Sequence, residues 1–230
     1  MSFIIKVIIP AFNEEASIGK VISEIPDLVS EIIVVSNNSS DQTEAVAKMT
    51  GATVLREPQK GYGYACLKGL EYIESLEIKP DIVVFLDGDY SDNPQDLHKI
   101  IAPIINDNMD LVIGSRVKRW REKGSMTFPQ VFGNWLATSL MKLFFNAKFT
   151  DLGPFRAIKY KKLLALQMQD KTYGWTVEMQ LKAIKQKLTY IEVPVHYKNR
   201  IGISKVSGTI KVAIFAGVKI LCWIFKYSFK

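Results

Sequence analysis

Short apolar runs alternate with helical repeats along the first half of the chain. Apolar runs predict strands at residues 4–9, 31–35, 53–56, 81–86 and 110–114. Between these runs, apolar positions recur at helical spacing, which predicts helices at residues 14–29, 41–51, 62–78 and 94–108. Strands that alternate with helices of this length form βαβ units. The pattern therefore predicts an α/β fold with a doubly wound, mostly parallel sheet and flanking helices.

The second half carries two helical patterns of a different kind. Over residues 131–149 a polar residue returns every four positions and bulky apolar or aromatic residues fill the rest. Residues 209–230 are largely apolar apart from four lysines, which fall within roughly 100° of one another on a helical wheel. The charge-free runs are shorter than the ~20 residues of a spanning helix. We expect amphipathic helices in the membrane interface, with Trp223 and Phe225 toward the acyl chains. The alternative for the last helix is packing on the domain.

Composition and charge narrow the class of protein. The chain has 230 residues, 48% of them hydrophobic, which suits one folded domain with a large core. Its two cysteines are far apart, so a disulfide framework or a zinc cluster is not expected. The net charge is +7, and residues 193–230 contain seven basic and no acidic residues. Because bulky apolar residues separate these cations, the pattern favours a membrane surface over nucleic acid. The apolar start is interpreted as a strand rather than a signal peptide.

A pair of carboxylates, Asp87 and Asp89, follows the apolar strand at residues 82–86. Ligands of parallel sheets bind beyond the carboxyl ends of the strands. Two acids placed one residue apart repel each other, and a divalent cation relieves that repulsion. Mg²⁺ commonly takes one or two protein carboxylates and completes its shell with water and substrate phosphates. The pair therefore indicates a binding site for a metal ion and a diphosphate, and the alternative is a polar turn without a ligand.

Three further loops follow predicted strands and are expected to meet the carboxylate pair. Residues 10–14 (Pro-Ala-Phe-Asn-Glu) offer small polar groups to a nucleoside, or simply cap a helix. Residues 36–43 are dense in short polar side chains that suit a base or a ribose, or that provide another helix N-cap. Residues 59–64 carry Gly61 and Gly63 ahead of a helix, where the backbone comes close to a ligand and the helix N-terminus favours an anion. The spacing of a Walker loop is absent.

The order of these motifs resembles the family 2 glycosyltransferases, which have the GT-A fold. The segments at 7–14, 33–43, 61–69 and 85–89 carry this resemblance. The segments at 113–116, 150–157, 174–179 and 200–205 are similar to the branch of dolichyl-phosphate mannose synthases and polyprenyl-phosphate glycosyltransferases. The resemblance covers nearly the whole chain. It implies inverting transfer from a nucleotide-diphosphate sugar with Mg²⁺ or Mn²⁺.

The resemblance also implies roles for individual residues. Asp87 and Asp89 hold the metal, and both are implied to be catalytic together with Glu178. The residues implied in nucleotide binding are Pro10, Phe12, Asn13, Glu14, Ser36, Asn37, Lys60, Gly61, Asp87 and Gly88. Those implied on the acceptor and phosphate side are Arg116, Asp151, Arg156, Arg200, Ser204 and Lys205.

The chain departs from the family pattern at two places. Ser36 and Asn37 stand where the family usually has an acidic residue that reads the base, so UDP and GDP both stay open as donor nucleotides. Ser91 stands where related enzymes often carry a Gln ligand of the metal.

Three of the implied residues have an alternative interpretation. Glu178 is a general base if the acceptor is a hydroxyl, or an exposed helix residue paired with Lys182. Asp151 and Arg156 either shape the acceptor side or form an ion pair that braces a turn.

These observations predict a hexosyltransferase with a polyprenyl or dolichyl phosphate acceptor. We expect a catalytic domain at residues 1–206 and a membrane-interface helix at 207–230, placed peripherally on the cytosolic membrane face. One alternative is the same chemistry on a hydroxyl of a glycan or cell-envelope acceptor. Another is a non-catalytic nucleotide-sugar-binding protein, which the departures at Ser36 and Ser91 support. No nucleic acid is expected as a partner, and a separate membrane partner is left open.

Overall fold

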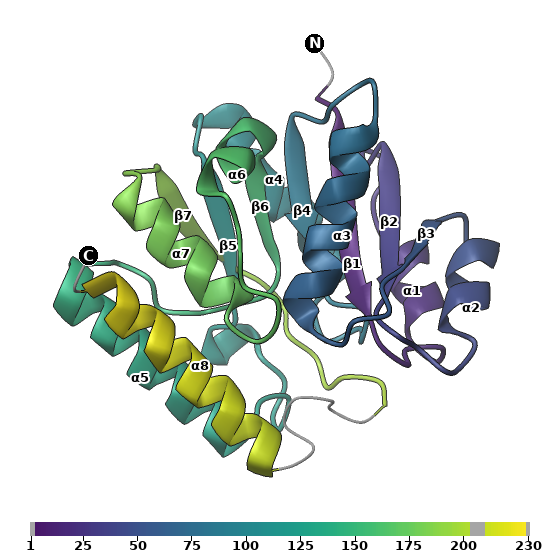
Figure 1. Ribbon diagram of the computed structural model, residues 1–230. Helices are drawn as coiled ribbons and strands as arrows, with labels where there is room; N and C mark the ends of the chain where they lie inside the picture. Colours follow the sequence, from purple (N-terminus) through teal and green to yellow (C-terminus); the bar gives the residue numbers. More distant parts are fainter. Residues whose placement is uncertain (1–2, 203–209, 229–230) are drawn as a thin grey trace.

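A single mixed sheet forms the centre of the molecule. The computed structural model describes residues 3–202 and 210–228, and within them the strand order is β3-β2-β1-β4-β6-β5-β7 (Figure 1). The strands are β1 (Ile5–Ala11), β2 (Glu31–Ser36), β3 (Thr53–Arg56), β4 (Ile82–Phe85), β5 (Leu111–Ser115), β6 (Arg156–Lys159) and β7 (Tyr190–Pro194). All neighbours pair in parallel except β6, which is antiparallel to β4 and β5. The predicted α/β class and mostly parallel sheet are confirmed.

The five predicted strands are present to within two residues at each end, whereas β6 and β7 were not predicted. Only four residues long, β6 begins with an arginine. In the edge strand β7 every side chain is at least partly exposed, and the strand ends in Pro194. Neither strand shows the continuous apolar run that marks the buried strands.

Helices cover both faces of the sheet, so each face has its own apolar core. Along β1, Ile8 belongs to the core beneath helix α3, whereas Val7 and Ile9 belong to the core on the opposite face. The helices are α1 (Ile18–Ser23), α2 (Thr43–Met49), α3 (Tyr62–Ser75), α4 (Leu97–Asn106), α5 (Phe128–Phe145), α6 (Tyr160–Leu166), α7 (Trp175–Lys185) and α8 (Ile210–Ser228), with short 3-10 turns η1 (Pro94–Asp96) and η2 (Lys118–Trp120).

The first helix is much shorter than the predicted range of 14–29. Asn13 adopts a left-handed backbone conformation, with φ of 54°, and the amide of Glu14 donates to the Thr43 hydroxyl. These contacts hold the residues before Ile18 in a turn. At the other end, Pro26 follows soon after Ser23 and cannot continue a helix.

Helix α5 starts three residues and ends four residues earlier than predicted. A reciprocal capping box between Thr127 and Gln130 begins it, and Asn146 ends it in the left-handed conformation with φ of 51°. Helix α8 lies beside α5 and also packs against α7 (Figure 1).

The predicted orientation of Trp223 toward acyl chains is wrong. Its side chain is buried, and the indole Nε1–H donates to the Asp170 carboxylate at 2.6 Å. Packing on the domain, the alternative for this helix, therefore describes Trp223, while Phe225 stays 43% exposed. Within the described part of the chain, no helix has the length and apolar character needed to cross a bilayer.

Candidate active site

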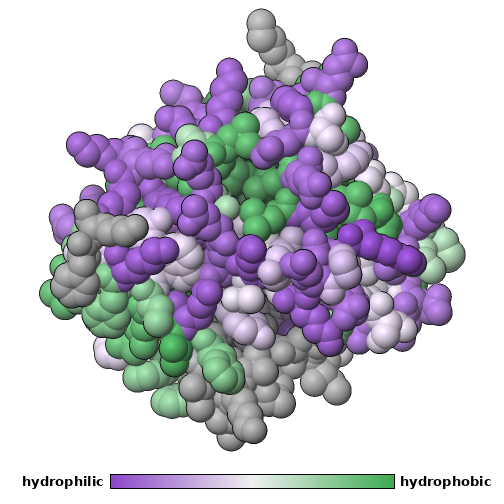
Figure 2. Space-filling view, in the orientation of Figure 1, coloured by the Kyte–Doolittle hydropathy of each residue, from purple (hydrophilic) through white to green (hydrophobic). Residues whose placement is uncertain are grey.

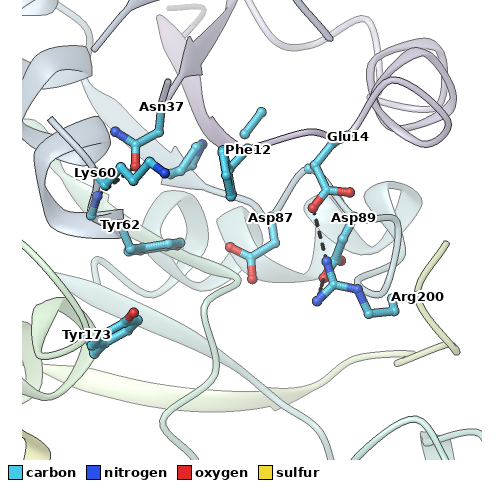
Figure 3. Close-up of a pocket in the computed structure, with 13 residues that line it drawn as sticks. Phe12, Glu14, Asn37, Lys60, Tyr62, Asp87, Asp89, Tyr173 and Arg200 are labelled. Atoms are coloured by element: carbon cyan, nitrogen blue, oxygen red, sulfur yellow. Dashed lines mark hydrogen bonds and ion pairs between the residues drawn. The ribbon is translucent and has the colours of Figure 1, made fainter. Parts of the chain in front are cut away.

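A pocket opens where the carboxyl ends of β1, β2 and β4 meet the first turn of α3, and it is called the central pocket below (Figure 3). Its lining residues are Pro10, Ala11, Phe12, Glu14, Asn37, Lys60, Gly61, Tyr62, Asp87, Gly88, Asp89, Tyr173 and Arg200. Three of the four predicted loops contribute directly, and the loop after β2 contributes through Asn37.

The carboxylate pair lies in the floor of the central pocket, in the turn after β4. Asp89 accepts hydrogen bonds from the backbone amide of Ser91 at 2.9 Å and from the Ser91 hydroxyl at 2.6 Å. Ser91 therefore orients Asp89 in this structure. The Asp87 side chain points into the pocket, and its Oδ1 is buried without a hydrogen-bond partner among the described residues.

Asp87 is electrostatically poised to bind a cation. Burial and the neighbouring charge of Asp89 raise the pKa of Asp87 to about 7. A divalent cation would compensate both causes, so this pair fits a metal. No group of three or more His, Cys, Asp or Glu side chains suited to a metal occurs among the described residues. Two carboxylates plus water and phosphate oxygens is an ordinary shell for Mg²⁺.

Arg200 bridges two acidic loops of the pocket. Its Nη2 lies 3.0 Å from Glu14 Oε1, and its Nη1 lies 3.2 Å from Asp89 Oδ2 (Figure 3). Backbone hydrogen bonds from Lys198 to Ser91 and from Ile201 to Asp89 hold this segment against the turn after β4. The guanidinium is thereby fixed in the pocket, where its planar fork suits a phosphate.

Asn37 braces the loop that precedes α3. Its amide donates to the carbonyl of Gln59 at 2.7 Å and accepts from the amide of Gly61 at 2.7 Å. Gly61 has φ of 151°, and a Cβ there would lie 2.2 Å from the Lys171 carbonyl oxygen. Only glycine fits this position, which brings Lys60 to the pocket beside the Phe12 ring.

The predicted anion site at the N-terminus of α3 is occupied by protein. The amides of Gly63 and Tyr64 donate to the carbonyls of Thr172 and Lys171 at 3.3 and 3.0 Å. These first-turn N–H groups are therefore engaged within the protein.

Two predicted nucleotide-contacting residues lie outside the lining of the pocket. The Asn13 side chain accepts a hydrogen bond from the amide of Ser40 and so ties the loops after β1 and β2 together. Ser36 is 1% exposed at the end of β2.

The two tyrosines of the pocket were missed by sequence reasoning. Tyr62 stands next to Gly61, in a loop that the sequence had singled out. Burial and the charge of Asp87 raise the pKa of the Tyr62 hydroxyl well above its ordinary value. Tyr173 comes from the segment before α7 and carries no local signal in the sequence.

A third acid, Asp92, is also buried beside the pair. Both of its carboxylate oxygens lack a hydrogen-bond partner among the described residues. Burial, followed by the charge of Asp87, raises its pKa well above the ordinary value. The signal for it was the third Asp of the run Asp-Gly-Asp-Tyr-Ser-Asp.

Arg116 and Asp151 form a buried pair with each other. Arg116 Nη2 lies 2.5 Å from Asp151 Oδ1, its Nε lies 3.0 Å from Oδ2, and its backbone amide donates to Oδ2 at 2.7 Å. The charge of Asp151 raises the pKa of Arg116 against the opposing effect of burial. Neither residue lines the central pocket.

The suggested ion pair between Asp151 and Arg156 is wrong. Arg156 is fully buried and donates to the carbonyls of Leu152, Gly153 and Thr176. Burial lowers its pKa to about 10. In this structure its guanidinium holds the turn before β6 and is shielded from solvent.

Glu178 is a buried structural carboxylate in this structure. It is 0% exposed, accepts hydrogen bonds from the amides of Gln169 and Asp170, and pairs with Lys182 at 2.7 Å. The predicted pairing with Lys182 is present, but the predicted exposure is wrong. Glu178 does not line the central pocket, so its implied role as a base has no support from its position. The predicted phosphate contacts Ser204 and Lys205 lie outside the described residues.

Comparisons with known proteins agree with the geometry. The sequence model of Glycosyl transferase family 2 matches residues 6–165. An uncharacterised glycosyltransferase of Mycobacterium tuberculosis is 32% identical, with 92% of this chain and 94% of the relative covered. The UDP-N-acetylglucosamine–dolichyl-phosphate N-acetylglucosaminyltransferase of Methanococcus voltae is 31% identical, with 84% of each covered. A dolichyl-phosphate hexose transferase of Haloferax volcanii is 28% identical over 86% of this chain and 85% of the relative.

Solved structures share the fold at lower identity. Glucosyl-3-phosphoglycerate synthase from Mycobacterium tuberculosis, in complex with Mn²⁺, UDP and phosphoglyceric acid, superposes with a TM-score of 0.78 at 22% identity. The match covers 98% of this chain and 78% of that one. The GT-A architecture that the sequence resemblance implied is thereby confirmed.

Proposed function

The chain belongs to family 2 of the glycosyltransferases, and on that basis we propose that it transfers a hexose, with inversion, from a nucleotide-diphosphate sugar to a polyprenyl phosphate. Binding of the nucleotide-sugar donor is supported by the central pocket, which is lined by Asp87, Asp89, Arg200 and Lys60 near the strand ends. The choice of a polyprenyl phosphate as acceptor is supported by two relatives that are named for transfer to dolichyl phosphate.

Asp87 and Asp89 are the residues that would hold a divalent cation. The unpartnered Oδ1 of Asp87 and its raised pKa support this assignment. Structures of the same fold contain Mn²⁺ or Mg²⁺ together with UDP. When bound, such a cation supplies Lewis-acid stabilisation of the departing diphosphate.

The protein's own groups act on the charge that develops as the donor bond breaks. An acceptor phosphate oxygen forms a bond to the anomeric carbon while the bond from that carbon to the nucleoside diphosphate breaks on the opposite face. The leaving diphosphate gains negative charge next to Arg200 and Lys60. Cations that are already fixed in place stabilise that charge without further reorganisation. A phosphate monoester has a second pKa of about 6, so the acceptor needs no general base at neutral pH.

This acceptor chemistry accords with the position of Glu178, which is remote from solvent and engaged by backbone amides. A hydroxyl acceptor would need a base within reach of the pocket. Arg200 is the proposed contact for the acceptor or donor phosphates in the described structure, and Lys205 is a further candidate from the sequence. Arg116 is already engaged by Asp151, and we propose that it supports the wall of the site.

The membrane is the proposed place of action. An exposed apolar surface on α5 and α8, called the α5/α8 face below, lies at the lower left of the molecule (Figure 2). Its members are Phe128, Val131, Phe132, Trp135, Leu143, Phe144, Phe215, Val218 and Phe225. Neither helix contains an acidic residue, while Lys142 and Lys226 lie among the apolar ones. Apolar area together with cations suits an anionic lipid surface, and we place the enzyme on its cytosolic side.

Nucleotide release tests the proposal. UDP-sugars and GDP-sugars are incubated with Mn²⁺ or Mg²⁺, with and without a polyprenyl phosphate in vesicles. Release that requires both the metal and the lipid supports the proposed function and identifies the donor. Release without lipid, stimulated by a soluble sugar or glycerate acceptor, would replace the lipid acceptor. Donor binding without release from any pair would favour a non-catalytic role.

A further inference from the structure

The segment at residues 170–174 connects helix α8 to the central pocket. Its Tyr173 lines the pocket, and its carbonyls accept the hydrogen bonds from Gly63 and Tyr64 described above. A Cβ on Gly63 would lie 2.0 Å from the Asp170 carbonyl oxygen, so the segment lies directly against the first turn of α3. Any displacement of the segment therefore moves a wall of the pocket and the support of α3 together.

One buried carboxylate fixes the shape of this segment. Asp170 is 2% exposed, and its Oδ1 accepts hydrogen bonds from the amides of Thr172 at 2.8 Å and Gly174 at 2.9 Å. Its backbone amide donates to Glu178 Oε2 at 2.7 Å. The side chain thus folds the segment around itself while Glu178 anchors its start.

The other oxygen of Asp170 is held by helix α8. Trp223 Nε1–H donates to Asp170 Oδ2 at 2.6 Å, and Lys219 Nζ lies 3.3 Å from the same oxygen. Helix and segment are in close contact, because a Cβ on Gly174 would lie 2.4 Å from Trp223 Nε1. A buried charge with this number of donors keeps one orientation, since leaving a donor unpaired costs free energy.

We propose that Asp170 is a positioning residue of the donor site, through which helix α8 sets the geometry of Tyr173 and of the first turn of α3. The proposal rests on the central pocket being the nucleotide-sugar site proposed above. Asp170 does not line the pocket, so it acts through the segment that it holds. Helix α8 also carries part of the α5/α8 face, so the element proposed to meet the membrane is the one that orders the pocket.

Trp223→Phe tests the proposal because it removes the indole N–H and keeps a ring. Binding of UDP and of GDP with Mn²⁺ is measured by calorimetry, which gives both the Kd and the fraction of competent sites. Loss of a hydrogen bond to a buried charge should loosen the segment at residues 170–174, which carries a wall of the pocket. We therefore expect the Kd for the nucleotide to rise about tenfold, with a stoichiometry near one. A purely structural role would lower the stoichiometry and leave the Kd unchanged, and that result would overturn the proposal.

Trp175→Phe is the matched control. Trp175 is also buried, but its Nε1 has no hydrogen-bond partner among the described residues. The control loses the same indole volume without losing a hydrogen bond, so its Kd should stay within about twofold of the wild type. An equal rise in both variants would assign the effect to lost volume and overturn the proposal. Lys219→Met, a milder change at a 44% exposed side chain, should raise the Kd less than Trp223→Phe.

Hydrogen exchange separates this proposal from the proposed function. In Trp223→Phe the amides of residues 61–64 and 170–174 should exchange faster than in the wild type, with or without nucleotide. Unchanged protection of residues 61–64 would overturn the connection from α8 to α3. If the wild-type protein bound neither UDP nor GDP, the donor assignment would fail, and the exchange experiment would still decide the role of Asp170.

Discussion

Arg200 and Glu14 are 186 residues apart in the sequence, yet Arg200 Nη2 lies 3.0 Å from Glu14 Oε1. The same guanidinium reaches Asp89, so one side chain joins the loops after β1 and β4. Glu14 and Asp89 thereby hold the Arg200 guanidinium within the pocket, where it can reach a phosphate group of a bound ligand.

Arg200→Lys should lower kcat/KM for the nucleotide sugar by about 10–100-fold, because a lysine cannot bridge two acids and a phosphate with a planar fork. Steady-state kinetics of nucleotide release measures the change. Arg56→Lys is the control, since Arg56 is 82% exposed and its ion pair with Glu44 lies at the surface. Equal activity of the wild type and Arg200→Lys would remove Arg200 from the site.

Asp87→Asn should abolish metal-dependent turnover while making the metal-free protein more stable at alkaline pH. The pKa of Asp87 in the folded protein is about 7, above its ordinary value of 3.8. Between these values the folded state binds the proton that the unfolded state has lost, so the wild type loses stability as the pH rises toward 7. Asparagine carries no charge, so the variant avoids this loss.

Urea unfolding with a chelator at pH 4 and pH 8 measures the effect. We expect the variant to exceed the wild type by on the order of 1–4 kcal/mol at pH 8, with little pH-dependent difference near pH 4. Asp27→Asn, at an exposed position, is the control. A variant that is less stable than the wild type at pH 8 would contradict the inference that the charged Asp87 carboxylate destabilises the metal-free folded protein.

The sequence predicted the elements that depend on local pattern. The apolar runs located the first five strands, and the polar turns after them located three loops of the pocket. Tyr173 could not be predicted, because its segment is held against the pocket by contacts with residues distant in the sequence, among them Gly63 and Trp223. Glu178 shows the same limit, since its helical spacing fits an exposed residue as well as a buried one. The bonds that decide its role come from backbone amides in another segment.

Glu178→Gln distinguishes a structural carboxylate from a catalytic base. Glutamine keeps the shape of the side chain but loses the negative charge. That charge pairs with Lys182 and strengthens the two hydrogen bonds from backbone amides. We therefore expect the free energy of unfolding to fall by about 3 kcal/mol. The folded fraction should keep kcat within about tenfold of the wild type, whereas removal of a general base costs about 10²–10⁴-fold. Urea unfolding and kcat, normalised to the competent sites, are measured together. Wild-type stability with a thousandfold lower kcat would restore the catalytic role.

The α5/α8 face should bind anionic membranes through its exposed aromatic side chains. Trp135 and Leu143 are 59% and 74% exposed, so replacing either with glutamate should leave the fold stable while placing a charge against the lipid. Burying an aromatic or leucine side chain in the lipid contributes about 1.5–3 kcal/mol to the free energy of membrane binding. Each variant should therefore bind vesicles at least about tenfold more weakly than the wild type. Co-sedimentation with vesicles that contain phosphatidylserine measures this loss. Met49→Glu is the control, because Met49 is 86% exposed on α2, outside the face. Equal weakening by Met49→Glu would show a general charge effect and remove this face as the membrane contact.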